Sequence, residues 1–454
     1  MSSIRWIDGY LQPAEWATVR LSVIGCGYLG AVHAAAMASI GHEVVGVDVD
    51  SAKIDALAAG VAPFFEPGLD ELLRTGLQSG RLSFTTDMSA IAGADVHFVG
   101  VGTPQRSGSG AADLSYVDSA FDGLRRHLRP GDVVAGKSTV PVGTAAALAE
   151  RLSGTGATLV WNPEFLREGW AVKDTIDPDR IVVGVPEGSE GIRAAAMLRD
   201  VFHPSAAKET PFIVTDYATA ELVKVAANAF LATKISFINA MAEIAEVTGA
   251  DVMHLAEALG HDDRIGRRFL GAGIGFGGGC LPKDIRAFAA RAEELGRRDS
   301  VSFLREVDSI NMRRRERAVE LVLESLPDGV VGKRVAVLGA AFKPHSDDIR
   351  DSPALDVAVR LHGLGAEVVV TDPAALDNAR RVHPQLAYAD ERDEAIRDAD
   401  AVIVVTEWDD YRVDLSPDHA SSLTSGRVIV DGRNCLDAAA WREAGWQYRG
   451  MGRP

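Results

Sequence analysis

Cys280 lies in a sequence context that favours a nucleophilic thiol. It ends the glycine run of GIGFGGGCLPKD, residues 273–284, and precedes Leu281-Pro282, where a proline suits the first turn of a helix. The positive end of a helix lowers the pKa of a thiol, and closely spaced glycines let a ligand lie against the backbone. Asp284, four residues later, would share a helix face with the thiol. A buried structural cysteine is the competing interpretation, and the glycine run disfavours it. We therefore predict covalent catalysis through Cys280.

Two other pairs, each spaced four residues apart, carry groups suited to acid–base chemistry. Lys224 and Asn228 would offer an ammonium and an amide to a substrate oxygen that becomes anionic. The segment VKVAANAFLA around them carries no other charge, which favours a desolvated lysine over a solvated surface one. Glu164 and Glu168 lie in NPEFLREG, just after the apolar run TLVW. Acids at the start of a surface helix are the alternative for this second pair.

The segment GCGYLG, residues 25–30, has the pattern of a dinucleotide-binding turn. It follows the apolar run LSVI and precedes an Ala-rich segment, so backbone amides at a helix N-terminus could bind a pyrophosphate. Asp48 follows Gly30 by eighteen residues, at the end of the next predicted strand, where a carboxylate binds ribose hydroxyls and repels a 2′-phosphate. A glycine turn with a solvated aspartate is the alternative. The pattern predicts NAD as the cofactor. Further candidates at neighbouring strand ends are Thr103, Ser138 and Thr139.

Alternating apolar and amphipathic segments must position these groups. Apolar runs such as LSVIG, EVVGVDV, DVHFVGV, DVVAGKST and IVVGV alternate with helical patterns from Leu21 onward, and the alternation returns after Pro327 with KRVAVLG, AEVVVTD, DAVIVVT and RVIVDG. This rhythm predicts βαβ units and parallel sheets. Between the two regions, a helical pattern runs from Thr219 to about Gly249. Its strong apolar face predicts packing against a neighbouring domain or a second subunit, and hence a homodimer or a higher homo-oligomer.

The expected fold class is therefore α/β, with two Rossmann-like doubly wound parallel-sheet domains joined by a long central helix and a helical dimerisation region. The predicted division has four parts. They are an N-terminal extension at 1–20, an NAD-binding domain at 21–214, a central helical domain with the cysteine loop at 215–315, and a C-terminal α/β domain at 316–454.

Composition narrows the function classes. The chain has 454 residues with 47% hydrophobic and 24% charged residues, which is ordinary globular usage. The net charge of -17 disfavours nucleic acid and anionic membranes as partners. The three cysteines are far apart, so they predict neither a disulfide framework nor a metal site, and they favour a cytoplasmic protein. The uncharged stretch 21–42 contains glycines and histidines and reads as a strand plus a helix, and residues 1–20 lack a signal-peptide pattern.

The motifs together resemble the UDP-glucose dehydrogenases, within the wider UDP-glucose/GDP-mannose dehydrogenase family. They are GCGYLG, FFEPGLDELL, VGTP, KSTVPVGT, NPEFLREG, ELVKVAANAFLATKISFINAMAEI, RIG, GFGGGCLPKD, FKPHSDDIRDSPA, TEWDDY and VDGRNCLD, in family order from about Leu21 to Leu436. The resemblance implies a four-electron oxidation of a nucleotide-sugar primary alcohol to a carboxylate with two NAD. UDP-glucose is the expected substrate and UDP-glucuronate the expected product, and the resemblance implies that the C-terminal domain at 316–454 binds the UDP-sugar.

The resemblance also implies roles for single residues. Cys280 would be the nucleophile, Arg264 would be donated to the partner subunit's sugar site, and Arg350 would contact the nucleotide on the NAD side. The expected catalytic residues are Cys280, Lys224, Asn228, Asp284, Thr139, Glu164 and Glu168, and which acid is the hydrolytic base stays open. The expected cofactor-binding residues are Gly25, Gly27, Tyr28, Leu29, Gly30, Asp48, Lys53, Thr103, Ser138, Glu168 and Arg350. The expected substrate-binding residues are Glu164, Phe165, Leu166, Lys224, Asn228, Arg264, Phe276, Gly277, Lys343 and Arg433.

The sequence departs from the family pattern in several places. Gly279 replaces the usual serine before the cysteine, which we expect to change loop flexibility and not the chemistry. Trp161 replaces a small polar residue before NPEF, and His345-Ser346 differ from the usual segment after FKP. The first twenty residues have no counterpart in the family pattern, and we assign them no role.

Three other functions compete with this interpretation. A two-electron dehydrogenase of the 3-hydroxyacid type also combines a Rossmann domain with a Lys and an Asn four apart, but it leaves Cys280 and the C-terminal domain without a use. A nucleotide-sensing regulator would need a lost catalytic group, and all the candidate groups are present. Within the family, GDP-mannose or another UDP-hexose is the alternative substrate, although the RIG and VDGR segments resemble the UDP-glucose branch.

Overall fold

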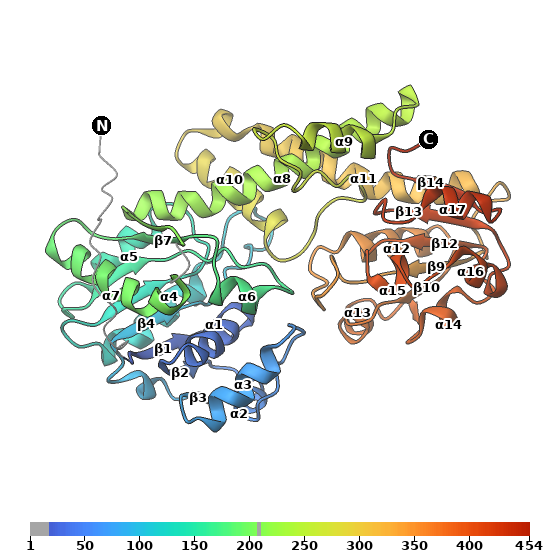
Figure 1. Ribbon diagram of the computed structural model, residues 1–454. Coiled ribbons are helices and arrows are strands. Elements are labelled where there is room, and N and C mark those ends of the chain that lie inside the picture. The colour runs from blue at the N-terminus through green and yellow to red at the C-terminus, as the bar shows by residue number, and fades with distance from the viewer. Residues whose placement is uncertain (1–17, 207–209) are drawn as a thin grey trace. The chain divides into compact units, whose positions relative to one another are not determined.

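The computed structural model describes residues 18–206 and 210–454. Most of the N-terminal extension expected at 1–20 therefore lies outside the described residues. The described residues form two compact units, which divide between residues 227 and 228 (Figure 1). We describe each unit by itself.

The first unit is built on a sheet of eight strands among the described residues, in the order β3-β2-β1-β4-β5-β6-β7-β8. The strands are β1 Arg20–Ile24, β2 Glu43–Val47, β3 Leu82–Thr85, β4 Val96–Val99, β5 Val133–Gly136, β6 Thr158–Trp161, β7 Ile181–Gly184 and β8 Phe212–Thr215. All neighbours are parallel except β6 and β7, which pair antiparallel at Trp161 and Gly184. The doubly wound parallel sheet is confirmed, and the single antiparallel contact differs from the all-parallel expectation. Chain order reverses between β1 and β4, where open α/β sheets bind ligands at their carboxyl edge.

Helices cover both faces of this sheet (Figure 1). They are α1 Tyr28–Ser39, α2 Ser51–Ala58, α3 Leu69–Gln78, α4 Ser115–Leu124, α5 Thr144–Leu152, α6 Ala171–Ile176 and α7 Ser189–Ala206, with short 3₁₀ turns at Met88–Ile91 and Arg125–His127. Because alternate strand residues point to opposite faces of the sheet, a strand contributes side chains to two hydrophobic cores. In β6, Val160 packs in the core under α1 and α3, whereas Leu159 and Trp161 pack in the core under α4 and α5.

The expected long helix is α8, Tyr217–Thr248, which begins in the first unit and ends in the second. By length and composition it could cross a membrane, but 44% of its apolar 18-residue stretch is buried inside the protein. Core helices of water-soluble proteins pass the same test, so this observation alone assigns no membrane role. The earlier uncharged stretch at 21–42 is divided into β1 and α1, as its glycines predict.

The second unit adds more helices to the rest of α8, followed by a second parallel sheet. The helices are α9 Val252–Gly260, α10 Leu281–Glu294 and α11 Phe303–Ser325, with a 3₁₀ turn at Arg298–Val301. The sheet strands are β9 Arg334–Leu338, β10 Glu367–Thr371, β11 Ala387–Tyr388, β12 Ala401–Val404, β13 Val428–Asp431 and β14 Gln447–Gly450. The remaining helices are α12 Pro353–Gly363, α13 Leu376–Val382, α14 Arg392–Ile396, α15 Asp409–Arg412, α16 Pro417–Leu423 and α17 Ala438–Glu443. The strand order β11-β10-β9-β12-β13-β14 repeats the doubly wound topology of the first unit, which confirms the expected fold class.

Candidate active site

The turn between β1 and α1 has the geometry of a pyrophosphate cradle. Gly25 has a φ of +88°, and a Cβ there would lie 2.7 Å from Val101. A Cβ at Gly30 would lie 1.8 Å from the carbonyl oxygen of Gly25, so the helix can approach the turn only with glycine at that position. By contrast, nothing lies within 4 Å of a Cβ built at Gly27, the N-cap residue of α1. The open N-terminus of α1 therefore suits the pyrophosphate of a dinucleotide.

Asp48 both closes this turn and holds a lysine. Its carboxylate accepts a hydrogen bond from the Cys26 backbone N–H at 2.8 Å and pairs with Lys53 Nζ at 2.9 Å. It also accepts from the Asp50 backbone N–H at 3.0 Å. Cys26 itself is buried, and burial, with a contribution from Asp48, raises the pKa of its thiol to about 12. Cys26 is therefore a structural residue of the turn, and Asp48 lies where a ribose-binding carboxylate is expected.

Glu66 connects the start of α1 to the segment after Glu168. Tyr28 Oη donates to Glu66, and burial followed by the Glu66 contacts raises the pKa of Tyr28. The backbone N–H groups of Gly169 and Val172 donate to the same carboxylate at 2.7 and 3.3 Å. Sequence analysis did not select Glu66, although it lies in the quoted FFEPGLDELL segment. Glu66 therefore fixes the backbone that directly follows Glu168. The Glu168 side chain is half-buried.

Lys137 and Glu164 form a buried ion pair near the carboxyl ends of β5 and β6. Lys137 Nζ lies 2.9 Å from Glu164 Oε2 and 3.0 Å from the Asn162 side-chain oxygen, and its side chain is only 3% exposed. The other oxygen of Glu164 accepts from the backbone N–H groups of Phe165 and Leu166 at 2.8 and 3.1 Å. Burial on its own raises the pKa of Glu164, but Lys137, the hydrogen bond from the Phe165 N–H and Lys224 outweigh burial and lower the pKa. Glu164 is thus held as an anion.

The beginning of α8 brings Lys224 to the same region. Glu221 accepts from the backbone N–H groups of Gly143 and Ala145, both at 2.7 Å, which fixes α8 against the start of α5. Lys224 Nζ then lies 5.4 Å from the centre of the Phe165 ring and acts electrostatically on Glu164. The first unit therefore brings together Glu164, Phe165 and Lys224, all expected as site residues.

The hydroxyl candidates at the sheet edge brace neighbouring strand ends. Thr103 Oγ1 donates to the carbonyl oxygen of Thr139 at 2.9 Å, and Ser138 Oγ donates to that of Val101 at 2.7 Å. The segments after β4 and β5 are thus tied together beside the glycine turn. This places all three candidates at the carboxyl edge of the sheet, as expected.

In the second unit, Cys280 is exposed at the N-cap of α10, with Pro282 in the first helical turn. The Asp284 side chain is 2% exposed and accepts from Asn228 Nδ2 at 2.6 Å and from Lys283 Nζ at 2.7 Å. Asn228 and Asp284 are therefore brought together, and both are largely buried. The position of Cys280 agrees with the helix start that the sequence predicts.

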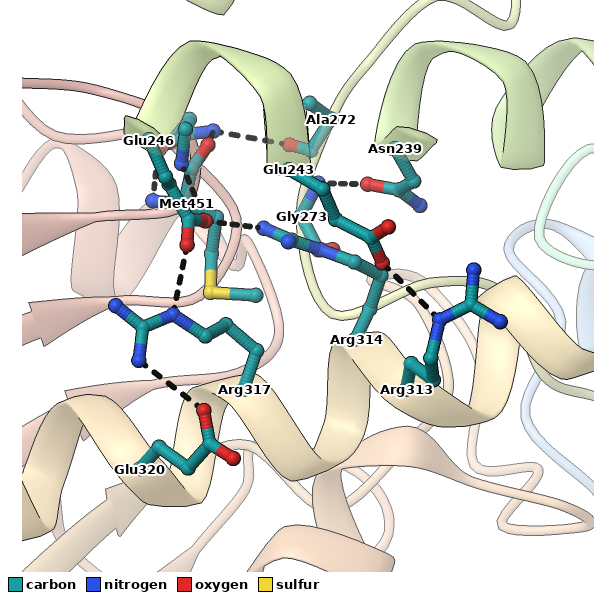
Figure 2. A network of polar contacts seen from close by, with 12 residues as sticks. Asn239, Glu243, Glu246, Ala272, Gly273, Arg313, Arg314, Arg317, Glu320 and Met451 are labelled. Atoms are coloured by element: carbon teal, nitrogen blue, oxygen red, sulfur yellow. Dashed lines mark hydrogen bonds and ion pairs between the residues drawn. The ribbon is translucent and has the colours of Figure 1, made fainter. Parts of the chain in front are cut away.

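The loop that leads to Cys280 is anchored to α8 and α11. Asn239 on α8 accepts from the Gly273 backbone N–H at 2.9 Å. Arg314 on α11, which is fully buried, extends toward the Gly273 carbonyl and pairs with Glu246 on α8 at 3.0 Å (Figure 2). Glu246 also binds Arg317 at 2.7 Å and thereby joins the two helices a second time. The network holds the loop at its beginning.

Arg433 and Arg350 hold the same loop farther along. The Arg433 guanidinium donates to the carbonyl oxygens of Gly275 at 2.8 Å and Phe342 at 3.0 Å. Arg350 is exposed and pairs with Asp348 at 2.7 Å, and a Cβ at Gly279 would lie 2.3 Å from its guanidinium carbon. Gly279 therefore does more than add flexibility, because it leaves room for Arg350 beside the residue that precedes Cys280.

Comparison with known proteins places this architecture in a family. Family models described as UDP-glucose/GDP-mannose dehydrogenase match at residues 19–205 (NAD binding domain), 218–313 (central domain) and 336–438 (UDP binding domain). The chain belongs to the UDP-glucose/GDP-mannose dehydrogenase family. UDP-glucose 6-dehydrogenase of Rhizobium meliloti is 42% identical over 96% of this chain and 100% of its own, and UDP-glucose 6-dehydrogenase YwqF of Bacillus subtilis is 40% identical over 96% and 98%. The structure of a UDP-glucose dehydrogenase from Pyrobaculum islandicum matches with a TM-score of 0.87 and 40% identity over 98% of this chain and 100% of that one.

Membership of the UDP-glucose/GDP-mannose dehydrogenase family confirms several predictions. The chain is a dehydrogenase, its cofactor is NAD, and a UDP binding domain indicates a UDP-linked substrate. The 3-hydroxyacid alternative does not account for that last domain. The four-part domain division, the individual site roles, the homodimer and the cytoplasmic location stay predictions.

The structure distributes the expected site residues of this dehydrogenase between its two units. Phe276 and Gly277 are buried in the loop before Cys280, and Lys343 Nζ lies 5.3 Å from the Phe342 ring centre. Arg264 lies in the segment after α9, with its side chain 89% exposed and paired to Asp262. Sequence analysis missed Lys137, although KSTVPVGT was quoted. It also missed Arg314, for which the sequence around α11 offers no signal.

Proposed function

We propose that this chain oxidises UDP-glucose to UDP-glucuronate with two NAD per sugar, through a thiohemiacetal and a thioester on Cys280. The observation that carries the proposal is an exposed thiol at the N-cap of α10, on a glycine loop anchored at several points. The helix N-terminus favours the thiolate, and the printed names of the relatives supply the substrate.

The chemistry needs a thiol because an aldehyde has no hydrogen on a tetrahedral carbon to give up as a second hydride. Bound NAD supplies the hydride acceptor, and the glycine turn with Asp48 and Lys53 would hold it. A water beside Lys224, or Lys224 itself in its neutral form, takes the hydroxyl proton of the alcohol in the first oxidation. The Cys280 thiolate then adds to the aldehyde carbon, and Lys224 and Asn228 stabilise the oxyanion before the second oxidation gives a thioester. Water cleaves the thioester, and an acidic side chain assists.

Glu164 is suited to orient groups in that last step. Its lowered pKa keeps it anionic, and the Phe165 and Leu166 amides together with Lys137 fix both carboxylate oxygens. A fixed anion accepts hydrogen bonds from a water or a lysine in one orientation. Glu168 and Asp284 remain the alternative proton acceptors.

A measurement of NADH formed per sugar tests the proposal. Two NADH per UDP-glucose are expected, with little turnover of GDP-mannose or UDP-N-acetylhexosamines. Cys280→Ala should form no acid while it still binds NAD. Cys435→Ala is the matched control, because burial raises the pKa of the Cys435 thiol and makes it unreactive. An acid-forming Cys280→Ala enzyme would overturn the covalent route.

We also propose that the exposed face of α8 forms a homodimer in the cytoplasm. Phe230, Phe237 and Ile244 are spaced seven residues apart and are 66%, 48% and 56% exposed. Heptad spacing places them on one stripe of the helix, and large apolar side chains exposed in a row favour a protein interface. Sedimentation velocity of Phe237→Asp should show a monomer where the unmodified chain shows a dimer.

A further inference from the structure

Asn434 lies where three segments of the second unit meet. It is only 7% exposed, and its backbone has a φ of +52°, a left-handed conformation that asparagine tolerates better than most residues. Its Nδ2 donates to the carbonyl oxygens of Ala272 at 3.1 Å and Met451 at 2.8 Å, and its Oδ1 accepts from the Met451 N–H at 3.0 Å. Both N–H groups and the oxygen of the amide therefore have partners. None of the roles proposed above uses Asn434.

The loop that leads to Cys280 begins beside the turn at 432–434. The Ile274 N–H donates to the carbonyl oxygen of Gly432 at 2.9 Å. A Cβ at Gly273 would lie 2.5 Å from the same oxygen, so the two backbones can approach this closely only with glycine there. The first residues of the loop are therefore packed directly against that turn.

The segment Met451–Arg453, which follows β14, is fixed to α8 and α9. The Gly452 N–H donates to Glu246 on α8 at 3.1 Å, and the Gly452 carbonyl accepts from the N–H of Val252, the first residue of α9, at 3.0 Å. Gly452 has a φ of +76°, and a Cβ there would lie 2.5 Å from the Cβ and 2.7 Å from the Cα of Ala242. Only glycine lets the segment lie this close to α8.

Two chains of contacts connect this segment to the loop. Met451 reaches the loop through Asn434, whereas Glu246 reaches it through Arg314, whose guanidinium extends toward the Gly273 carbonyl (Figure 2). Helix α8, the loop and the segment after β14 are thus joined in a closed network. Loss of one contact in such a network weakens the others.

We propose that Asn434 is a positioning residue for the oxidation, which holds the loop before Cys280 in one conformation by tying it to Met451–Arg453. This inference rests on the proposed function, in which the thiol must meet the substrate carbon in a defined geometry. The loop also contains Phe276 and Gly277, both expected to bind the sugar nucleotide. Loss of the Asn434 amide should therefore affect kcat and the KM for the sugar nucleotide, and leave the KM for NAD unchanged.

Replacement of Asn434 by glycine tests the amide alone, because glycine adopts a φ of +52° without strain. In Asn434→Gly, kcat should fall roughly tenfold and the KM for UDP-glucose should rise about threefold. Hydrogen–deuterium exchange of the enzyme without ligands should quicken at residues 272–279 and stay unchanged in α13. A merely structural contact would lower the urea midpoint without changing exchange of the loop in the folded protein. Asp398→Gly is the matched control, since Asp398 is exposed and has a similar φ of +57°.

Gly452→Ala tests the same network from the other side. Its methyl group would collide with Ala242 and push the segment after β14 away from α8. We expect a similar fall in kcat and quickened exchange in the loop. Gly445→Ala is the matched control, because Gly445 has a φ of +85° but nothing lies within 4 Å of a Cβ there. In the double variant of Asn434→Gly and Gly452→Ala, kcat should equal that of the slower single variant, because both changes act through one network.

Three outcomes would overturn the proposal. They are unchanged exchange of the loop in a folded Asn434→Gly, quickened exchange with normal kcat, and losses in kcat that multiply in the double variant. If Asn434→Gly does not fold, Gly452→Ala supplies the exchange and kcat readouts with the same consequences. The proposed function fails separately, if the unmodified enzyme forms a single NADH per sugar or if Cys280→Ala still forms the acid. The exchange measurement contains no substrate and does not depend on that result.

Discussion

The side-chain amide of Asn311 binds both backbone groups of Phe276, four residues before Cys280. Asn311 Oδ1 accepts from the Phe276 N–H at 2.7 Å, and its Nδ2 donates to the Phe276 carbonyl at 2.9 Å. Asn311 is fully buried in α11, and a Cβ at Gly275 would lie 2.2 Å from its oxygen. The Asn311 side chain therefore satisfies the backbone hydrogen bonds of the cysteine loop in the way that a neighbouring β-strand would.

Asn311→Ala should destabilise the protein and slow catalysis together. Two buried backbone groups would lose their partner, at a cost of about 2–4 kcal/mol in the free energy of unfolding, and the cysteine loop would lose its orientation. Urea denaturation and kcat for NADH formation measure the two effects. Ser309→Ala, at an exposed position of the same helix, should change neither. Full kcat in the destabilised Asn311→Ala enzyme would show that the loop holds its shape without this contact.

Lys137→Met should move the acid limb of the pH profile. In the unmodified chain the pKa of Glu164 lies below its usual value, so the anion persists into the acidic range. Without Lys137, burial raises that pKa, and activity should be lost at a higher pH than in the unmodified chain. The kcat profile between pH 4 and 8 checks this, with the exposed Lys173→Met as control. If the acid side of the kcat profile does not move, Glu164 does not take part in catalysis.

Asp48→Ser should narrow the preference for NAD over NADP. The change removes a negative charge that repels the 2′-phosphate, and it releases Lys53 from its 2.9 Å ion pair to attract that group. The ratio of kcat/KM values for the two cofactors should shift by about tenfold. Some loss with NAD is also expected, because Asp48 holds the Cys26 amide. Asp55→Asn, exposed on α2, should leave the ratio unchanged.

Gly279→Ala should weaken NAD binding while it preserves the fold. Its methyl group would displace only the end of the Arg350 side chain, which can move into solvent. If Arg350 contacts the cofactor, the KM for NAD should rise about threefold to tenfold. Gly271→Ala is the matched control, since nothing lies within 4 Å of a Cβ there. An equal KM in both variants would place Arg350 away from the cofactor.

Arg264→Ala should raise the KM for the sugar nucleotide by roughly thirtyfold, because a lost charge-assisted contact costs about 2 kcal/mol. The side chain is 89% exposed and is paired with its neighbour Asp262, so it can reach a second subunit without loss of fold stability. Arg268→Ala, exposed in the same segment, should bind the substrate normally.

Mixed subunits test whether Arg264 acts across the dimer. A heterodimer of Arg264→Ala and Cys280→Ala subunits has one site with both groups intact if the arginine is donated. Recovered activity is expected. Inactive mixtures, under conditions in which subunits exchange, would place Arg264 in the site of its own chain or outside any site.

Sequence reasoning was most successful where a function depends on consecutive residues. The glycine turn with Asp48 and the helix start at Cys280 were predicted because their geometry follows from local residue types. Contacts between distant segments were not predicted. Glu66 binds Gly169 from 103 positions away, and Asn311 binds Phe276 from 35 positions away. A single asparagine or glutamate has no local signature for such a partner, because only the assembled fold brings the two together. The antiparallel contact of β6 with β7 was missed for the same reason.

Helix α8 carries Lys224 in the first unit and Asn228 in the second, one helical turn apart. A single residue inserted between them would turn Asn228 by about 100° around the helix axis relative to Lys224 and move it by about 1.5 Å along that axis. The two side chains would then no longer share one face of the helix. Evolution can lengthen surface loops of either unit freely. Within this one turn, however, insertions and deletions should be absent from every active relative.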